Sequence, residues 1–152
     1  MFGRFKIEEG FAGIVTRLGK VNRIVNAGTH GKIPFVENVI RVDLRPRNTK
    51  TIFTAQTKDR ETVKVEVEID YAAALSDDAY IKIAFDGVSD TDRAHFFNKV
   101  AEKLSQGMIE QRTMQDAVNN ADVLTGKLKS EAGVPFEDLG FKILDLKLNV
   151  TA

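Results

Sequence analysis

One ten-residue segment constrains the fold more than any other part of the sequence. Between positions 62 and 71 apolar and polar residues alternate without a break. The apolar members of the alternation are Val63, Val65, Val67, Ile69 and Tyr71. A repeat of two residues is the period of a β-strand with one buried face, and it does not fit a helix. The segment therefore predicts a strand of an antiparallel sheet whose second face meets water.

The other segments of the first 73 residues also have the character of strands. Residues 11–18 and 21–25 are apolar runs separated by a Gly19-Lys20 turn. Residues 40–45 alternate apolar and charged side chains until Pro46 ends the run. A turn follows Lys58-Asp59, and we expect it to avoid a positive φ because Arg60 occupies the position. This part of the chain predicts a sheet.

After residue 74 the pattern changes to that of helices. Residues 77–85 form a short candidate, with Asp77 and Asp78 in its first turn. Thr91 or Asp92 is predicted to cap a longer helix with an apolar stripe from Phe97 to Met108. The Thr113-Asp116 pair resembles a capping box and predicts a further helix, which Gly133 and Pro135 are expected to stop.

The chain closes with a strand whose apolar phase slips between Ile143 and Leu144, which predicts a bulge or bend there. Strands, then helices, then a strand indicate an α+β fold. We predict an antiparallel twisted sheet in the N-terminal half and helices packed in the C-terminal half, closed by this strand. No linker or repeat interrupts the chain, so we expect one domain, 1–152, with a sheet-rich half (1–73) and a helix-rich half (74–152).

Composition argues against several classes of chemistry. The chain has no cysteine and only two histidines, so disulfides, thiol chemistry and a multi-histidine metal cluster within one chain are ruled out. His30 lies in a Gly-rich segment, where hydrogen bonding to loop backbone is the expected role. The acidic pairs Glu8-Glu9, Asp77-Asp78 and Glu137-Asp138 are expected to be solvated structural charges, and the glycines near the N-terminus do not have the spacing of a phosphate loop. We therefore expect no catalytic site and no cofactor.

Charge is balanced overall but uneven along the chain. Residues 4–60 carry twelve Lys/Arg and five Asp/Glu, whereas residues 61–152 carry ten and seventeen. Three interpretations remain open: scattered solvated charge, a basic face toward anionic lipid, or a basic end that meets the acidic end of the next copy. No apolar run reaches the roughly 18–20 residues that cross a bilayer, so we expect any membrane association to be peripheral.

Five segments together resemble the SPFH (stomatin, prohibitin, flotillin, HflK/C) or band-7 family. They follow in the family's order over nearly the whole chain: residues 8–21, 27–35, 40–45, 57–71 and 133–148. Relatives usually add an N-terminal membrane segment and a C-terminal coiled coil. Neither is found here, so we expect an excised domain or a short member.

The resemblance implies a non-enzymatic scaffold that forms homo-oligomers at a membrane surface and organises membrane patches or membrane proteins. The alternative is an adaptor that docks on a membrane-bound AAA protease and regulates it. Nucleic acid is not an expected partner, because no surface aromatics are interleaved with the basic residues.

Two groups of residues are candidates for lipid contact. The expected membrane-contact residues are Phe2, Phe5, Ile33, Pro34 and Phe35. The expected lipid-headgroup residues are Arg41, Arg45 and Arg47, the densest basic cluster. These three would share one strand face if the strand continued past Pro46, and the competing interpretation pairs them with Glu66 or Glu68 across the sheet.

Overall fold

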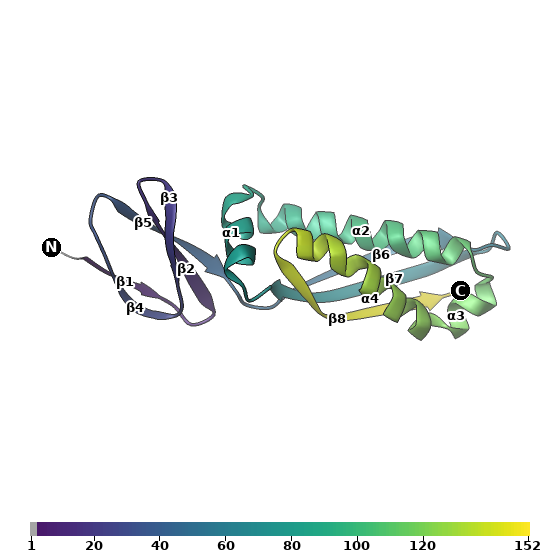
Figure 1. Ribbon diagram of the computed structural model, residues 1–152. Coiled ribbons are helices and arrows are strands. Elements are labelled where there is room, and N and C mark those ends of the chain that lie inside the picture. The colour runs from purple at the N-terminus through teal and green to yellow at the C-terminus, as the bar shows by residue number, and fades with distance from the viewer. Residues whose placement is uncertain (1–2) are drawn as a thin grey trace. The chain divides into compact units, whose positions relative to one another are not determined.

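A computed structural model describes residues 3–152 (Figure 1). The chain divides into two compact units: residues 1–46, 72–87 and 139–141 form the first, and residues 47–71, 88–138 and 142–152 form the second. The first unit holds nine Lys/Arg and seven Asp/Glu, a net charge of +2, and the second holds thirteen and fifteen, a net of −2. The charge asymmetry along the sequence is thus largely lost in the folded units. The basic residues of 47–60 belong to the second unit, and the aspartates of 77–86 belong to the first.

The first unit is built from two small antiparallel sheets and one helix. In the two-stranded sheet, β1 (Gly3–Ile7) pairs with β4 (Gly28–Lys32), and in the three-stranded sheet the order is β3 (Lys20–Val25), β2 (Phe11–Arg17), β5 (Glu37–Asp43). The helix α1 (Asp77–Phe85) contacts β2 and β5 and is capped by the Ser76 side chain. The core of this first unit contains Ile7, Ala12, Ile14, Val15 and Val42, all at most 2% exposed.

The second unit contains the strand that the alternating segment predicts. The sheet order is β6 (Arg47–Gln56), β7 (Thr62–Ala73), β8 (Phe141–Thr151). Every apolar residue of the alternation, from Val63 to Tyr71, is at most 2% exposed, so the predicted buried face is confirmed. In β8 the buried positions change from Phe141 to the even-numbered Leu146, Leu148 and Val150, and Leu144 is left 43% exposed.

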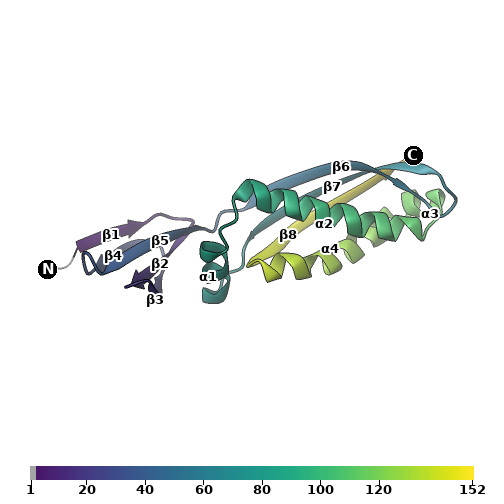
Figure 2. The same ribbon diagram turned by 90° about the horizontal axis from the view of Figure 1, so that it is seen from above.

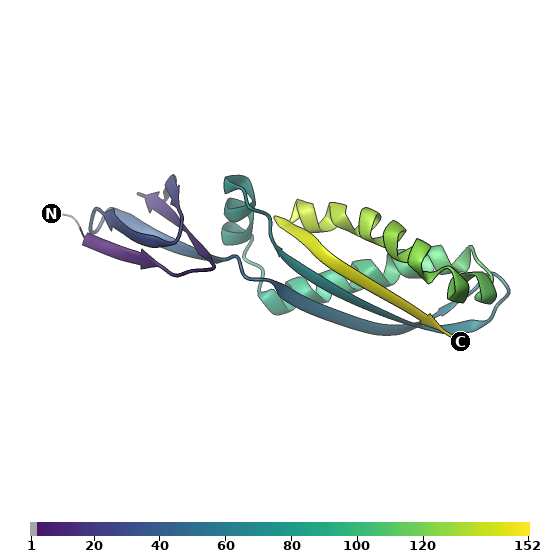
Figure 3. The same ribbon diagram turned by 90° about the horizontal axis from the view of Figure 1, so that it is seen from below.

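Helices cover one face of this second sheet. They are α2 (Asp90–Glu110), α3 (Met114–Asn119) and α4 (Ala121–Asp138). Figures 2 and 3 show α2 and α4 side by side on the same side of β6, β7 and β8. The Phe97 and Phe136 rings stack with centroids 3.7 Å apart, and Tyr71 meets both rings edge-on. This aromatic cluster joins both long helices to the central strand. The predicted α+β class, with its closing strand, is confirmed.

Two helix boundaries differ from the prediction. The cap of α2 is Ser89, whose hydroxyl accepts a hydrogen bond from the Asp92 N–H, so the helix begins before the expected Thr91 or Asp92. The expected stop at Gly133 and Pro135 is wrong, because α4 continues through Pro135 to Asp138. Burial of Phe136 against the aromatic cluster outweighs the hydrogen bond that proline removes.

The turn between β6 and β7 also corrects an expectation. Arg60 has φ 61°, so this turn does use the left-handed region, at a cost of about 1–2 kcal/mol for a side chain other than glycine. Compensating hydrogen bonds surround it: the Thr57 N–H donates to Glu61 O (2.9 Å), and the Thr57 hydroxyl donates to the Asp59 carboxylate. Asp59 in turn accepts from the Met114 N–H at 3.2 Å. Because these bonds fix the turn against the α2–α3 connection, the strained residue is tolerated.

Candidate functional site

Phe35 is the most exposed large apolar residue among those the structure describes. It lies in the short turn between β4 and β5, with a relative exposure of 104% and φ 71°. Ile33 and Pro34, which precede it, are half-buried. The left-handed backbone strains a residue other than glycine, and the uncovered ring gains no stabilisation from burial. This turn therefore presents an aromatic side chain to the surroundings.

Glu37 fixes the turn that carries Phe35. Its side chain is 1% exposed and accepts hydrogen bonds from the Ile33 N–H at 2.7 Å, Arg23 at 2.8 Å and Arg17 at 3.3 Å. The Glu37 N–H donates back to Ile33 O at 3.1 Å. The Ile33 N–H, with smaller contributions from Arg23 and Arg17, lowers the pKa of Glu37 although burial opposes the shift. The carboxylate is thus the ionised centre on which the turn is built.

A second exposed apolar residue, Leu18, lies beside this turn and was not predicted. Leu18 and Gly19 form the two-residue hairpin between β2 and β3, with φ 51° and 81°, and Leu18 is 79% exposed. The Leu18 N–H donates to Val36 O at 3.0 Å, which holds the hairpin against the turn of Phe35. The expected turn at Gly19-Lys20 is thus one residue too late, because the preceding apolar run includes Leu18. A two-residue hairpin normally has asparagine, aspartate or glycine at the position of Leu18.

The other predicted membrane-contact residues differ in their surroundings. Phe5 is half-buried on β1 and its ring lies 5.5 Å from that of His30, its partner in the ladder with β4. The His30 Nε2 is 2.7 Å from Asn26 O, which is the backbone contact expected of it. Phe2 lies outside the described residues. Of the predicted set, only Phe35 is shown to be fully available to a partner.

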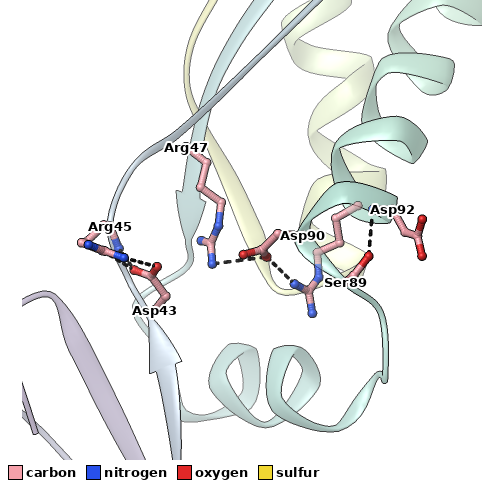
Figure 4. Close-up of polar contacts among 7 residues, drawn as sticks. Asp43, Arg45, Arg47, Ser89, Asp90 and Asp92 are labelled. Carbon is pink, nitrogen blue, oxygen red and sulfur yellow. Dashed lines mark hydrogen bonds and ion pairs between the residues drawn. The ribbon is translucent and has the colours of Figure 1, made fainter.

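Two of the three predicted headgroup arginines, Arg41 and Arg45, lie in the first unit and have partners there. Arg41 is exposed, and its guanidinium donates to Lys6 O at 3.0 Å. Arg45 pairs with Asp43 at 2.8 Å, which raises the pKa of Arg45, and its guanidinium lies 5.0 Å above the Phe11 ring. Figure 4 shows the Asp43–Arg45 pair.

Arg47 belongs to the second unit. Its side chain is 15% exposed and pairs with Asp90 at 3.6 Å, and Asp90 also binds Arg93 at 2.8 Å (Figure 4). The competing interpretation, in which Glu66 or Glu68 pairs with the arginine cluster, is not what the structure shows. Glu66 pairs with Lys50 at 2.8 Å instead. The strand also does not continue past Pro46, because β5 ends at Asp43 and β6 begins at Arg47. The predicted headgroup role of the three arginines stays a prediction.

Metal binding and group transfer each require a particular arrangement of side chains. Within residues 3–152, no group of three or more His, Cys, Asp or Glu is placed to hold a metal ion. An open groove in the second unit, between the start of α4 and β8, is lined mainly by apolar and uncharged residues, with Asp122 and Lys147 as its charged members. The two charged groups do not form the nucleophile, base and oxyanion arrangement that acyl or phosphoryl transfer requires.

Fold and site together define an α+β domain with an exposed aromatic turn. Comparison with protein families agrees: the sequence model of the SPFH domain / Band 7 family matches residues 5–151. The chain therefore belongs to the SPFH domain / Band 7 family. No curated protein matches it at the significance required. In the described part of the chain, no helix has the length and apolar character needed to span a membrane.

Proposed function

We propose that this domain acts as a scaffold at a membrane surface, where several copies assemble and organise membrane patches or membrane proteins. Membership of the SPFH domain / Band 7 family supports association with a membrane. The observation that carries the proposal is Phe35, which lies fully exposed in a turn fixed by the buried Glu37. Contact with lipid would remove the exposed ring from water.

One ring gives weak membrane affinity. Burying a phenylalanine side chain contributes about 1.5–3 kcal/mol, which alone gives only transient attachment. Several copies joined in one assembly multiply such contacts, because binding of the first raises the effective concentration of the others. The proposal therefore couples attachment to homo-oligomerisation, and the edge strands β6 and β8 of the second unit are available for contacts between copies.

Vesicle flotation tests the proposal directly. We expect the wild-type chain to float with phosphatidylcholine–phosphatidylglycerol vesicles and Phe35→Ser to float much less, since the exposed ring is lost. Phe85→Ser is the matched control, because Phe85 is 52% exposed at the end of α1 in the same unit. We expect this control to float like the wild type.

Two results would contradict the proposal. If the wild type failed to float under any condition, the domain would act as a protein-docking unit, such as an adaptor for a membrane-bound protease. If both serine variants lost flotation equally, exposed apolar surface in general would be responsible and the turn would have no special role.

A further inference from the structure

Leu18 violates two rules of local structure at once. The hairpin of Leu18 and Gly19 has positive φ at both central residues, the geometry of a type I′ turn. Such a turn favours asparagine, aspartate or glycine at the first position, because a branched apolar side chain is strained there. The leucine also gains nothing from burial, since it is 79% exposed. Folding therefore does not account for this residue, and such violations concentrate at functional sites.

Leu18 and Phe35 belong to one surface, which we call the double tip (residues 17–20 and 32–36). Backbone joins its two loops through the Leu18 N–H to Val36 O bond at 3.0 Å. Side chains join them as well, because Arg17 at the base of the hairpin binds Glu37 at the base of the turn. Both apolar residues have left-handed backbone and both are exposed. Two such violations, on loops that a backbone hydrogen bond joins, point to one shared partner.

Basic residues are concentrated in and beside the two loops. Segments 17–23 and 32–37 contain four basic residues and one acidic residue, a net charge of +3. The acidic residue, Glu37, is buried and is shared by Arg17 and Arg23, whose side chains remain 48% and 35% exposed. Lys20 is exposed at the start of β3, and Lys32 is half-buried just before the turn. The two loops therefore combine two exposed apolar side chains with nearby cations, and their one acidic group is buried.

We propose that the double tip binds an anionic bilayer, with Leu18 and Phe35 entering the acyl boundary and Arg17, Lys20 and Lys32 contacting headgroup phosphates. This inference rests on the proposed membrane function and extends it in two ways. It adds the β2–β3 hairpin as a second insertion point, and it assigns headgroup contact to basic residues of the tip in addition to the predicted arginine cluster. Charge complementarity selects anionic lipid as the partner.

The first test is Leu18→Asn, which separates function from folding. Asparagine suits the left-handed turn, so we expect the melting temperature to rise by about 2–4 °C. Vesicle binding should weaken about tenfold or more, because one inserted side chain is lost. Leu75→Asn is the matched control, since Leu75 is 69% exposed in the same unit and lies outside the double tip. We expect it to leave vesicle binding unchanged.

The second test addresses the cations. Lys20→Glu should weaken binding to phosphatidylcholine–phosphatidylglycerol vesicles several-fold, and the loss should shrink at high salt. Lys129→Glu makes the same change in net charge on an exposed position of α4 and should bind like the wild type. The wild type should bind vesicles of phosphatidylcholine alone much more weakly. Equal binding to both kinds of vesicle would overturn the cationic part of the inference.

A spectroscopic measurement distinguishes insertion from simple adhesion. Because the chain has no cysteine, Val21→Cys in the full chain accepts a single environment-sensitive fluorophore next to the hairpin, at a residue that is 43% exposed. We expect a blue shift on anionic vesicles and none for the same label at Leu75→Cys. No shift at position 21 while flotation persists would overturn insertion of the hairpin.

Failure of this inference and failure of the proposed function give different results. If Leu18→Asn and Lys20→Glu bound like the wild type while Phe35→Ser lost flotation, the membrane role would stand and the double tip would be wrong. If the wild type bound no vesicle, both would fail. If the tip variants kept vesicle binding but lost contact between copies in sedimentation, the double tip would be a protein interface and the inference would be overturned.

Discussion

Glu37 is a single residue that holds several parts of the first unit in place. It connects β2 and β3, through Arg17 and Arg23, to the turn that carries Phe35. The sequence predicted the exposed aromatic turn but not this support, because the partners are 14 and 20 positions away and neither arginine stands out locally. Leu18 was missed for a related reason. Its apolar character suggested a strand position, whereas its exposure results from its place in a tight turn.

The ionised state of Glu37 makes a prediction about pH. Its pKa is held below the ordinary value of 4.5, so the folded state favours the carboxylate. The stabilisation is complete above that ordinary value and is lost as pH falls through the lowered pKa. We therefore expect Glu37→Gln to lower the melting temperature at neutral pH, and the difference from wild type to narrow as the solution is acidified below about pH 4.

Thermal melts at several pH values measure this difference. Glu9→Gln is the control, because Glu9 is exposed in the turn between β1 and β2. If the difference in melting temperature between the wild type and Glu37→Gln stayed constant from neutral to acid pH, the charge on Glu37 would not stabilise the unit.

At the scale of elements, the hydrophobic period predicted a strand correctly where burial of one face is the dominant contribution to stability. β7 alternates because one face is buried and the other meets water, and no competing signal interrupts it. Helix boundaries depend on small free-energy differences between neighbouring capping residues. Ser89 therefore caps α2 although Thr91 and Asp92 are also suitable caps. Pro135 inside α4 could not be anticipated, because the buried contact of Phe136 that carries the helix past it comes from another element.

The two faces of β7 give a paired prediction. Val65 is 0% exposed, so Val65→Asp would bury an unpaired charge and destabilise the fold by at least about 3 kcal/mol. Glu66 lies on the opposite face in a partly exposed ion pair with Lys50, so Glu66→Lys should change stability little. Chemical denaturation measures both. Equal effects of the two substitutions would show that the assignment of faces is wrong.

At the scale of the whole molecule, the division into units does not follow the sequence halves. The boundary suggested near residue 73 separates strand-rich from helix-rich sequence, but β6 and β7 belong to the same sheet as β8. Local sequence patterns relate only residues that are close along the chain, whereas the pairing of β7 with β8 joins residues far apart in it. The family could be inferred from ordered local segments, whereas the interleaving of the units could not.

This interleaving predicts the behaviour of fragments. A fragment of residues 74–152 retains α2, α3, α4 and β8 but loses β6 and β7, the strands whose buried face the helices cover. We expect it to lack a cooperative thermal transition by circular dichroism. Adding a separate fragment of residues 1–73 should restore the transition, because the central strand returns. A cooperative melt of the 74–152 fragment alone would contradict this view of the sheet.

The chain passes between the two units five times, at residues 46/47, 71/72, 87/88, 138/139 and 141/142. A single genetic crossover therefore cannot exchange one whole unit by itself. A cut within residues 47–141 divides both units, and a cut nearer either end divides the unit found there. A cut near residue 46 would separate the double tip from α1 of the same unit, so an exchange there would have to preserve the contacts of α1 with β2 and β5. Diversity in a lineage of this fold would then arise by changing exposed loops, such as those of Leu18 and Phe35, and by adding sequence at the ends.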